Sequence, residues 1–120
     1  MKYMLLIYDS AETRARFMGP EGTALMAEMD ELLGELTESG ELLSTHGLAD
    51  PANTKTVRVR DGVPAVTDGP LAEAKEHFGG YLIVECETPE RAVDIAVRFP
   101  ASRFHPLEVR PIMEPSGEEM

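Results

Sequence analysis

Two uninterrupted apolar segments constrain the fold more than any other feature of the sequence. They are Tyr3–Tyr8 and Tyr81–Val84, and each has the length of a β-strand. A strand with one face in water alternates apolar and polar residues, whereas these segments are apolar at every position. We therefore predict two central strands that are covered on both faces.

Two helices are predicted between and after these strands. Leucine and methionine recur every three or four residues within Glu21–Ser39, with acidic residues between them, which indicates an amphipathic helix that ends at Gly40. The second helix starts at Thr88 and Pro89, which combine an N-cap hydroxyl with a proline at the first helical position. It ends at Pro100.

Further strands are predicted at Leu42–Leu48 and Leu107–Met113. The segment between the helices also contains a hairpin, because Thr56–Arg60 alternates with period two and Val63–Thr67 runs back after the turn residues Asp61 and Gly62. We expect one helical turn over residues 71–77, broken by the glycines at 79 and 80.

The predicted order is strand, helix, strand, hairpin, strand, helix, strand, which is an α+β, ferredoxin-like arrangement of two βαβ halves joined by a hairpin. Both helices then cover one sheet face, and the apolar central strands require a cover on the other. We infer a homodimer with the two sheets packed face to face. Residues 1–113 form the expected single domain, and residues 114–120 a polar C-terminal tail.

The charge of the chain excludes several classes of function. The chain has 11 Lys and Arg residues and 22 Asp and Glu residues, so its formal net charge is −11. This charge disfavours binding to nucleic acid or to an anionic membrane. No apolar run is long enough to span a bilayer, and no signal-peptide cleavage site follows the N-terminus, so we expect a cytoplasmic protein. One cysteine and three scattered histidines predict neither disulfide nor metal site, and no nucleotide fingerprint predicts a cofactor.

Four segments together resemble the DGPF family of the YCII-related proteins: MKYMLLIY, TVRVRDG, VTDGPLAEAKEHFGGYLIVE and LEVRPI. The resemblance covers nearly the whole chain and departs at Leu71, where the family name implies Phe. A leucine there is expected to preserve packing. The resemblance implies a ferredoxin-like fold and a dimeric α/β barrel, and it brings no settled reaction.

Better-studied YCII-related proteins are thought to use an acid–base pair: a His near the start of the first helix and an Asp just before the Pro that ends the second. This sequence has Pro20, Glu21, Gly22 and Thr23 at the first place and Phe99 before Pro100 at the second. The pair is absent, which argues against the same catalysis here.

Asp68 and His46 are the candidate catalytic residues. Asp68 precedes Gly69 and Pro70, so its carboxylate can act as a base in a pocket or can cap the following turn. His46 lies on the predicted second strand and can pair with Asp68 if both face one cavity, or can simply be packed or solvated. The other two histidines lie beside predicted breaks, which favours exposure.

The candidate ligand-binding residues are Arg58, Lys75, Gly69 and Pro70. Arg58 and Arg60 share one face of a hairpin strand and can hold an anionic ligand or pair with neighbouring carboxylates. Lys75 is the only cation of its turn, where Glu73 and Glu76 flank it, and a solvated turn explains these residues equally well. The lone Cys86 is expected to be a buried, unreactive thiol.

Three functions stay open from sequence alone. The first is a homodimeric small-ligand binding or accessory protein with a cavity between its sheets. The second is a cofactor-free isomerase or lyase in which Asp68 or His46 transfers a proton. The third is a structural or regulatory partner protein without a ligand pocket.

Overall fold

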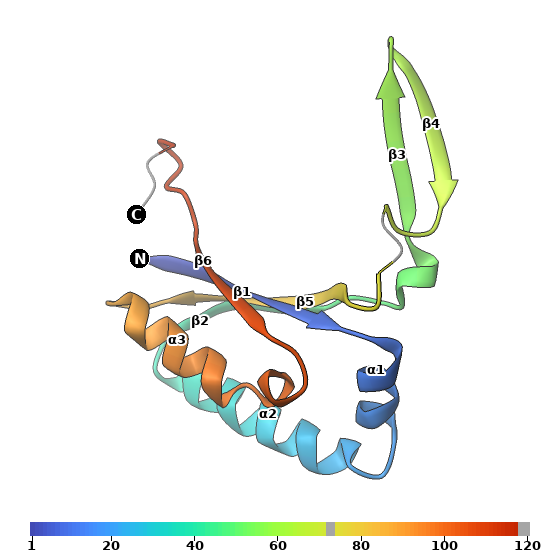
Figure 1. Ribbon diagram of the computed structural model, residues 1–120. Coiled ribbons are helices and arrows are strands. Elements are labelled where there is room, and N and C mark those ends of the chain that lie inside the picture. Colours follow the sequence, from blue (N-terminus) through green and yellow to red (C-terminus); the bar gives the residue numbers. More distant parts are fainter. Residues whose placement is uncertain (72–73, 118–120) are drawn as a thin grey trace.

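The computed structural model describes residues 1–71 and 74–117 and has an α+β fold (Figure 1). Its elements, in chain order, are β1 (Lys2–Asp9), α1 (Ala11–Met18), α2 (Gly22–Glu38), β2 (Leu42–Gly47), β3 (Lys55–Arg60), β4 (Val63–Asp68), β5 (His77–Glu85), α3 (Pro89–Arg98) and β6 (Leu107–Pro111). No helix in the described ranges is long and apolar enough to cross a membrane.

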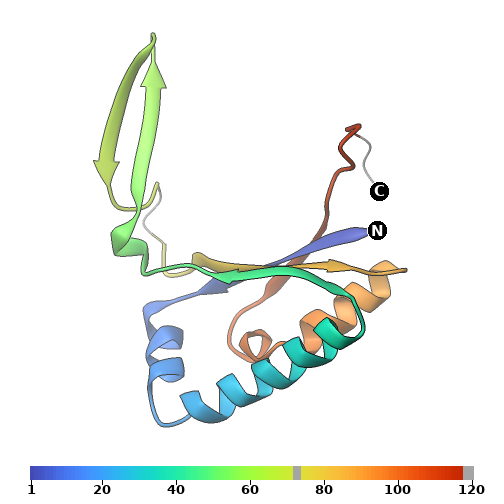
Figure 2. The same ribbon diagram turned by 180° about the vertical axis from the view of Figure 1, so that it is seen from behind.

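The main sheet is antiparallel, with strand order β2, β5, β1, β6. This order is that of a ferredoxin-like fold, as the sequence predicts. All three helices lie on one face of the sheet, and the other face is open (Figures 1 and 2). Tyr3 and Leu5 of β1 and Leu82 and Val84 of β5 point into the core between sheet and helices, where each is at most 2% exposed.

We expected both faces of the central strands to be covered. In the single chain the helices cover one face, and the other face is open. Met4 and Leu6 alternate with the buried residues of β1, and Tyr81 and Ile83 do so in β5; all four are only partly buried. The open face of the sheet is therefore apolar at its centre. An uncovered apolar surface of this kind is typical of an interaction site.

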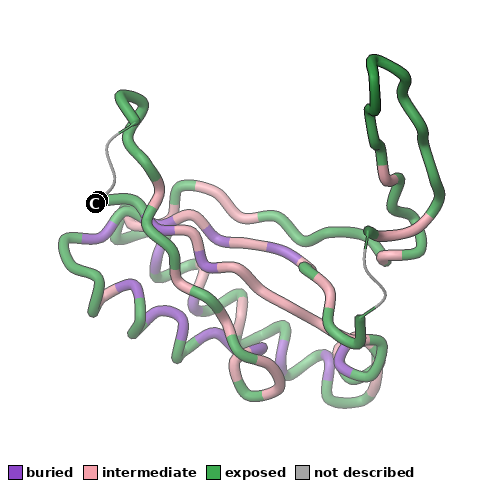
Figure 3. The backbone as a smooth tube through the Cα atoms, turned by 45° about the horizontal axis from the view of Figure 1, so that its top comes forward, coloured by how far each residue is buried: buried purple, intermediate pink, exposed green. Residues whose placement is uncertain are grey.

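The hairpin of β3 and β4 forms a separate two-stranded sheet. Its turn has the predicted positive φ angles, 50° at Asp61 and 77° at Gly62. The hairpin stands away from the main sheet on the side opposite the helices (Figures 1 and 2), and its strands are exposed almost throughout (Figure 3). The Cα radius of gyration is accordingly 16.5 Å, compared with about 14 Å for a compact domain of this length.

The structure differs from the local predictions in two segments. Helix α1 was not predicted, because it is short and polar, and it starts at the N-cap Ser10, whose Oγ accepts the backbone N–H of Thr13. The helical turn expected over residues 71–77 is not formed by its described residues, of which 75 and 76 are bends and His77 begins β5. Residues 72 and 73 lie outside the described ranges.

The glycines at 79 and 80 lie inside β5 and do not end a secondary-structure element. A Cβ on Gly79 would lie 2.7 Å from the carboxyl carbon of Asp9, and one on Gly80 would lie 2.8 Å from the carbonyl oxygen of His46. Both contacts are too close for a side chain. The two glycines thus let Asp9 lie over β5 and let β2 pair closely with it.

Candidate functional site

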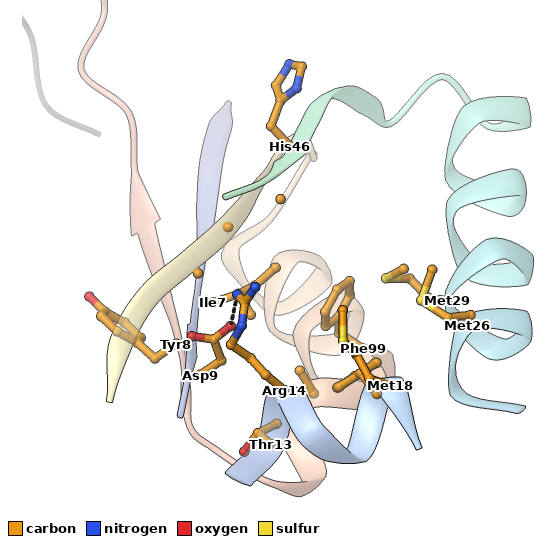
Figure 4. Close-up of a pocket in the computed structure, with 15 residues that line it drawn as sticks. Ile7, Tyr8, Asp9, Thr13, Arg14, Met18, Met26, Met29, His46 and Phe99 are labelled. Atoms are coloured by element: carbon orange, nitrogen blue, oxygen red, sulfur yellow. Dashed lines mark hydrogen bonds and ion pairs between the residues drawn. The ribbon is translucent and has the colours of Figure 1, made fainter. Parts of the chain in front are cut away.

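A mainly apolar cavity lies between the sheet and helices α1 and α2, with a volume of about 360 Å³ (Figure 4). Side chains of Phe17, Met18, Met26, Met29 and Phe99 supply its apolar wall. The volume lies within the range of small-molecule sites, and methionines adapt to ligands of irregular shape. The cavity therefore has the size and chemistry to take a small apolar body.

Asp9 and Arg14 form the polar wall of this cavity. Asp9 ends β1, Arg14 lies on α1, and Arg14 Nη1 donates to Asp9 Oδ2 at 3.3 Å (Figure 4). Arg14 Nε lies 4.0 Å from Asp50 Oδ2 on the other side. Guanidinium groups bind carboxylates and other anions, so Arg14 supplies a positive charge at the edge of an apolar space.

A second cavity of about 570 Å³ adjoins the first, and Asp9 and Arg14 line both. Its lining is more polar and includes Ser10, Lys75, Glu76, His77 and His105. The ion pair between Arg14 and Asp9 therefore separates an apolar cavity from a charged one.

His105 connects two elements beside this wall. Its Nε2 lies 2.5 Å from Thr13 Oγ1 and 3.2 Å from Ser10 Oγ, and its Nδ1 lies 3.3 Å from Glu76 Oε1. The His105 side chain is 13% exposed, and Thr13 is buried. The expectation that His105 is exposed is wrong, because the turn before β6 folds it back onto the start of α1.

Sequence reasoning missed this group of residues. Asp9, Ser10 and Thr13 belong to the turn and first residues of α1, a helix that hydrophobic periodicity does not reveal. The only local signal is Ser10 followed by Glu12, an N-cap and an acidic first turn. The contact with His105 joins residues more than 90 positions apart and leaves no local pattern.

The segment containing Asp68 lies at the base of the hairpin. Asp68 ends β4, is exposed, and pairs with Lys55 of β3. Because residues 72 and 73 lie outside the described ranges, its role as a cap of the following turn stays a prediction. Gly69 has a φ of 93°, which favours glycine, and its N–H donates to the carbonyl of Thr54. Pro70 lines a small hollow of about 280 Å³ together with His77 and Phe78.

The other predicted site residues are distributed over the molecule. His46 is exposed on the open face of the sheet, and its ring centroid lies 5.7 Å from that of Tyr81. It is one of the residues that line the apolar cavity, although its ring points away from the other lining side chains (Figure 4). Arg58 is exposed on the hairpin, Lys75 lines the charged cavity, and Glu73 lies outside the described residues. Within the described ranges, no hydrogen bond joins His46 to Asp68, so their pairing stays a prediction.

Glu41 and Cys86, which do not line the two cavities described above, have shifted pKa values. Arg91 donates two hydrogen bonds of 2.8 Å to Glu41 and lowers the pKa of this carboxyl from 4.5 to about 2. Burial raises the pKa of the Cys86 thiol, which is 4% exposed. The prediction that Cys86 is buried is confirmed, and the raised pKa disfavours the reactive thiolate.

The sequence model of the YCII-related domain family matches residues 1–116. The chain belongs to the YCII-related domain family. An uncharacterised protein of Rhizobium meliloti (strain 1021) is 27% identical over 96 residues, which is 80% of this chain and 77% of that protein. The family assignment from the four sequence segments is thereby confirmed.

A solved structure supports the fold of this YCII-related chain. It is 5-chloro-2-hydroxyhydroquinone dehydrochlorinase (TftG) from Burkholderia phenoliruptrix AC1100, in complex with 2,5-dihydroxybenzoquinone. The TM-score is 0.50 at 15% sequence identity, over 98% of this chain and all of that one. At this identity the likeness concerns the fold alone.

Proposed function

We propose that this YCII-related protein is a homodimer that binds a small ligand with an apolar body and an acidic group. The observation that carries the proposal is the apolar cavity with Arg14 at its edge. Apolar lining with a few convergent polar groups is typical of ligand sites. Lys75 in the adjoining cavity adds a second positive charge for the acidic group.

The solved relative offers a first probe for this site. Its solved structure is a complex with 2,5-dihydroxybenzoquinone, a small planar ring with acidic hydroxyl groups. A ring of this size fits the volume of the apolar cavity, and an ionised hydroxyl finds a partner in the Arg14 guanidinium. The same compound is therefore a rational first ligand for this chain.

The dimer in this proposal forms through the open face of the sheet. The hairpin rises on that side (Figure 2), and each of its strands has six residues, about 20 Å in length. Packed sheets are about 10 Å apart. A second copy placed on the open face therefore lies within reach of the hairpin, which can hold it at the edge.

The hairpin carries an apolar surface that fits this role. Val57 pairs with Val66 and Val59 with Pro64 on one of its faces, and the three valines are 60–65% exposed. A two-stranded hairpin is marginally stable alone in water, so a partner surface is expected to cover these residues. Arg58 lies on the opposite face of the hairpin.

Isothermal titration calorimetry with 2,5-dihydroxybenzoquinone tests ligand binding. Saturable binding to the wild type is expected, with a clear loss of affinity in Arg14→Gln. The matched control is Arg98→Gln, which removes a guanidinium that pairs with Glu35 outside the cavities and is expected to leave affinity unchanged. Equal affinity in all three proteins would contradict the assigned site.

Analytical ultracentrifugation tests the dimer. We expect the wild type to sediment as a dimer and Val57→Lys to weaken it, because a charge then meets the partner surface. Arg58→Gln, on the other face of the same strand, is the control. A monomeric wild type at all concentrations would remove the homodimer from the proposal.

The isomerase or lyase with Asp68 and His46 is the second candidate. One observation favours it: His46, which pairs with Tyr81 in the sheet, points to the open side (Figure 4). The hairpin whose strand β4 ends at Asp68 rises on the same side (Figure 1). A dimer would then supply Asp68 of one copy to His46 of the other.

The third candidate, a purely structural protein, predicts that no small molecule raises the melting temperature, since a ligand of the folded state must stabilise it.

A further inference from the structure

The strongest unassigned group outside the ion pair of Arg14 is the chain of contacts from Thr13 through His105 to Glu76. These residues come from the start of α1, the turn before β6 and the residue before β5. A hydroxyl, an imidazole and a carboxylate in sequence are the components of a proton relay.

The partners of the imidazole define the position of its proton. An ionised carboxylate only accepts hydrogen bonds, so Glu76 favours the proton on Nδ1 of His105. The lone pair of Nε2 then accepts the hydroxyl of Thr13 at 2.5 Å. Ser10 Oγ, 3.2 Å from the same nitrogen, holds this arrangement from the helix N-cap.

The relay joins the two cavities. Thr13 lines the apolar cavity, whereas Glu76 and His105 line the charged one. Thr13 is 5% exposed and Glu76 is half exposed, so one end is enclosed and the other reaches water. A proton that enters at Thr13 can therefore move through the relay toward the end that is nearer to water.

We propose that this relay takes a proton from a phenolic or enolic hydroxyl bound in the apolar cavity. The ligand O–H bond breaks and its proton passes to Thr13 Oγ1, while the Thr13 proton passes to Nε2 of His105. The products are the ligand oxyanion and an imidazolium. Glu76 stabilises the imidazolium, and Arg14, in the same cavity wall as Thr13, faces the oxyanion.

This inference rests on the proposed ligand site and adds the chemistry of that site. A ligand with an aromatic or enolic body satisfies the apolar wall, and its hydroxyl supplies the proton. Because the proton moves within the complex, the net charge of the site does not change. No oxidant, metal or cofactor is needed for the step.

The test uses 4-nitrophenol as the probe, because its phenolate is yellow and its phenol is not. At a pH below the ordinary pKa of the probe, the wild type is expected to bind it as the phenolate. Glu76→Gln, which keeps the shape of a half-exposed side chain, and Thr13→Val are each expected to lower the bound phenolate-to-phenol ratio by about tenfold, one pKa unit. Thr37→Val and Glu31→Gln, both on the exposed side of α2, are the controls.

A second ligand allows the relay to be tested separately from ligand binding. 4-Nitroanisole has no acidic proton, so all variants are expected to bind it equally. If both ligands bind and the phenolate fraction is the same in every variant, the relay is overturned and the ligand site stands. If neither ligand binds the wild type, the ligand site is overturned together with the relay.

Discussion

The α/β body and the β3–β4 hairpin are stabilised in different ways. In the body, Leu5, Leu36, Leu82, Val84 and Ile95 are fully buried between sheet and helices. In the hairpin, Val57, Val59, Val63 and Val66 are each 60–66% exposed, and both strands lack a further hydrogen-bonded neighbour. Apolar side chains therefore stabilise the body by burial within one chain, whereas those of the hairpin stay exposed in the single chain.

This difference shows that local sequence pattern and stability are separate properties. The hairpin has the clearest alternation and turn signal in the sequence, and its register follows them residue by residue. Its conformation is thus encoded locally. Its stability is not, because an isolated hairpin buries too little apolar area.

The largest expected effect is the loss of stability when a substitution in the core of the body leaves an empty space. Leu36→Ala removes a fully buried side chain and is expected to lower the free energy of unfolding by about 2–5 kcal/mol. Val66→Ala in the hairpin is expected to change the stability of the monomer by less than about 0.5 kcal/mol. Urea denaturation of both variants at low concentration makes the comparison, and equal losses would refute it.

The next effect concerns the close approach of β2 to β5. Gly80→Ala places a methyl group 2.8 Å from the His46 carbonyl and is expected to cost about 1–3 kcal/mol through forced separation of the strands. Gly47→Ala is the control, because a Cβ there meets nothing within 4 Å. Thermal unfolding of both variants measures the difference, and an unaffected Gly80→Ala would show that the strands move apart freely.

The ion pair of Glu41 and Arg91 in the body makes the stability of the fold depend on pH. Arg91 depresses the folded-state pKa of Glu41 from 4.5 to about 2, so the stabilisation is complete above pH 4.5 and is lost as the pH falls toward 2. Glu41→Gln is expected to be less stable than the wild type at pH 6 and to approach it near pH 2. The urea midpoint measured against pH tests this, and parallel curves would contradict it.

The smallest effect is expected for the ion pair of the hairpin. Lys55 and Asp68 have side-chain exposures of 66% and 83%, so water and salt screen their attraction. Asp68→Asn is therefore expected to be indistinguishable from the wild type in monomer stability. A loss of catalysis or of ligand affinity in this variant without a loss of stability would support a functional role for Asp68.

Much of the fold follows from local pattern, and the site does not. The apolar segments predict β1 and the second half of β5, leucine spacing predicts α2, and Thr88 with Pro89 predicts the start of α3. Each of these signals lies within one element. The two glycines of β5 suggest a chain break from the sequence, but they lie within the strand. Glycine is needed at these positions because Asp9 and the carbonyl of His46, both distant in sequence, approach the backbone closely.

The candidate site depends on such distant contacts throughout. Lys75 lines the charged cavity, and its role in ligand binding stays a prediction. The contact between Thr13 of the apolar cavity and His105 of the charged one could not be predicted. Their spacing along the chain carries no information about it. The family resemblance did not reveal it either, since the acid–base pair ascribed to better-studied relatives is absent from this chain.

The strand order has a consequence for how the chain folds during synthesis. Within the described residues, β1 pairs with β5 and β6 and with no other strand, and β2 pairs with β5 alone. Until residue 85 has left the ribosome, the nascent chain can form helices and the hairpin but none of the main sheet. β5 then pairs with β1 and β2, and β6 is added to β1 only after residue 111 has been made, so the main sheet assembles late and through long-range contacts.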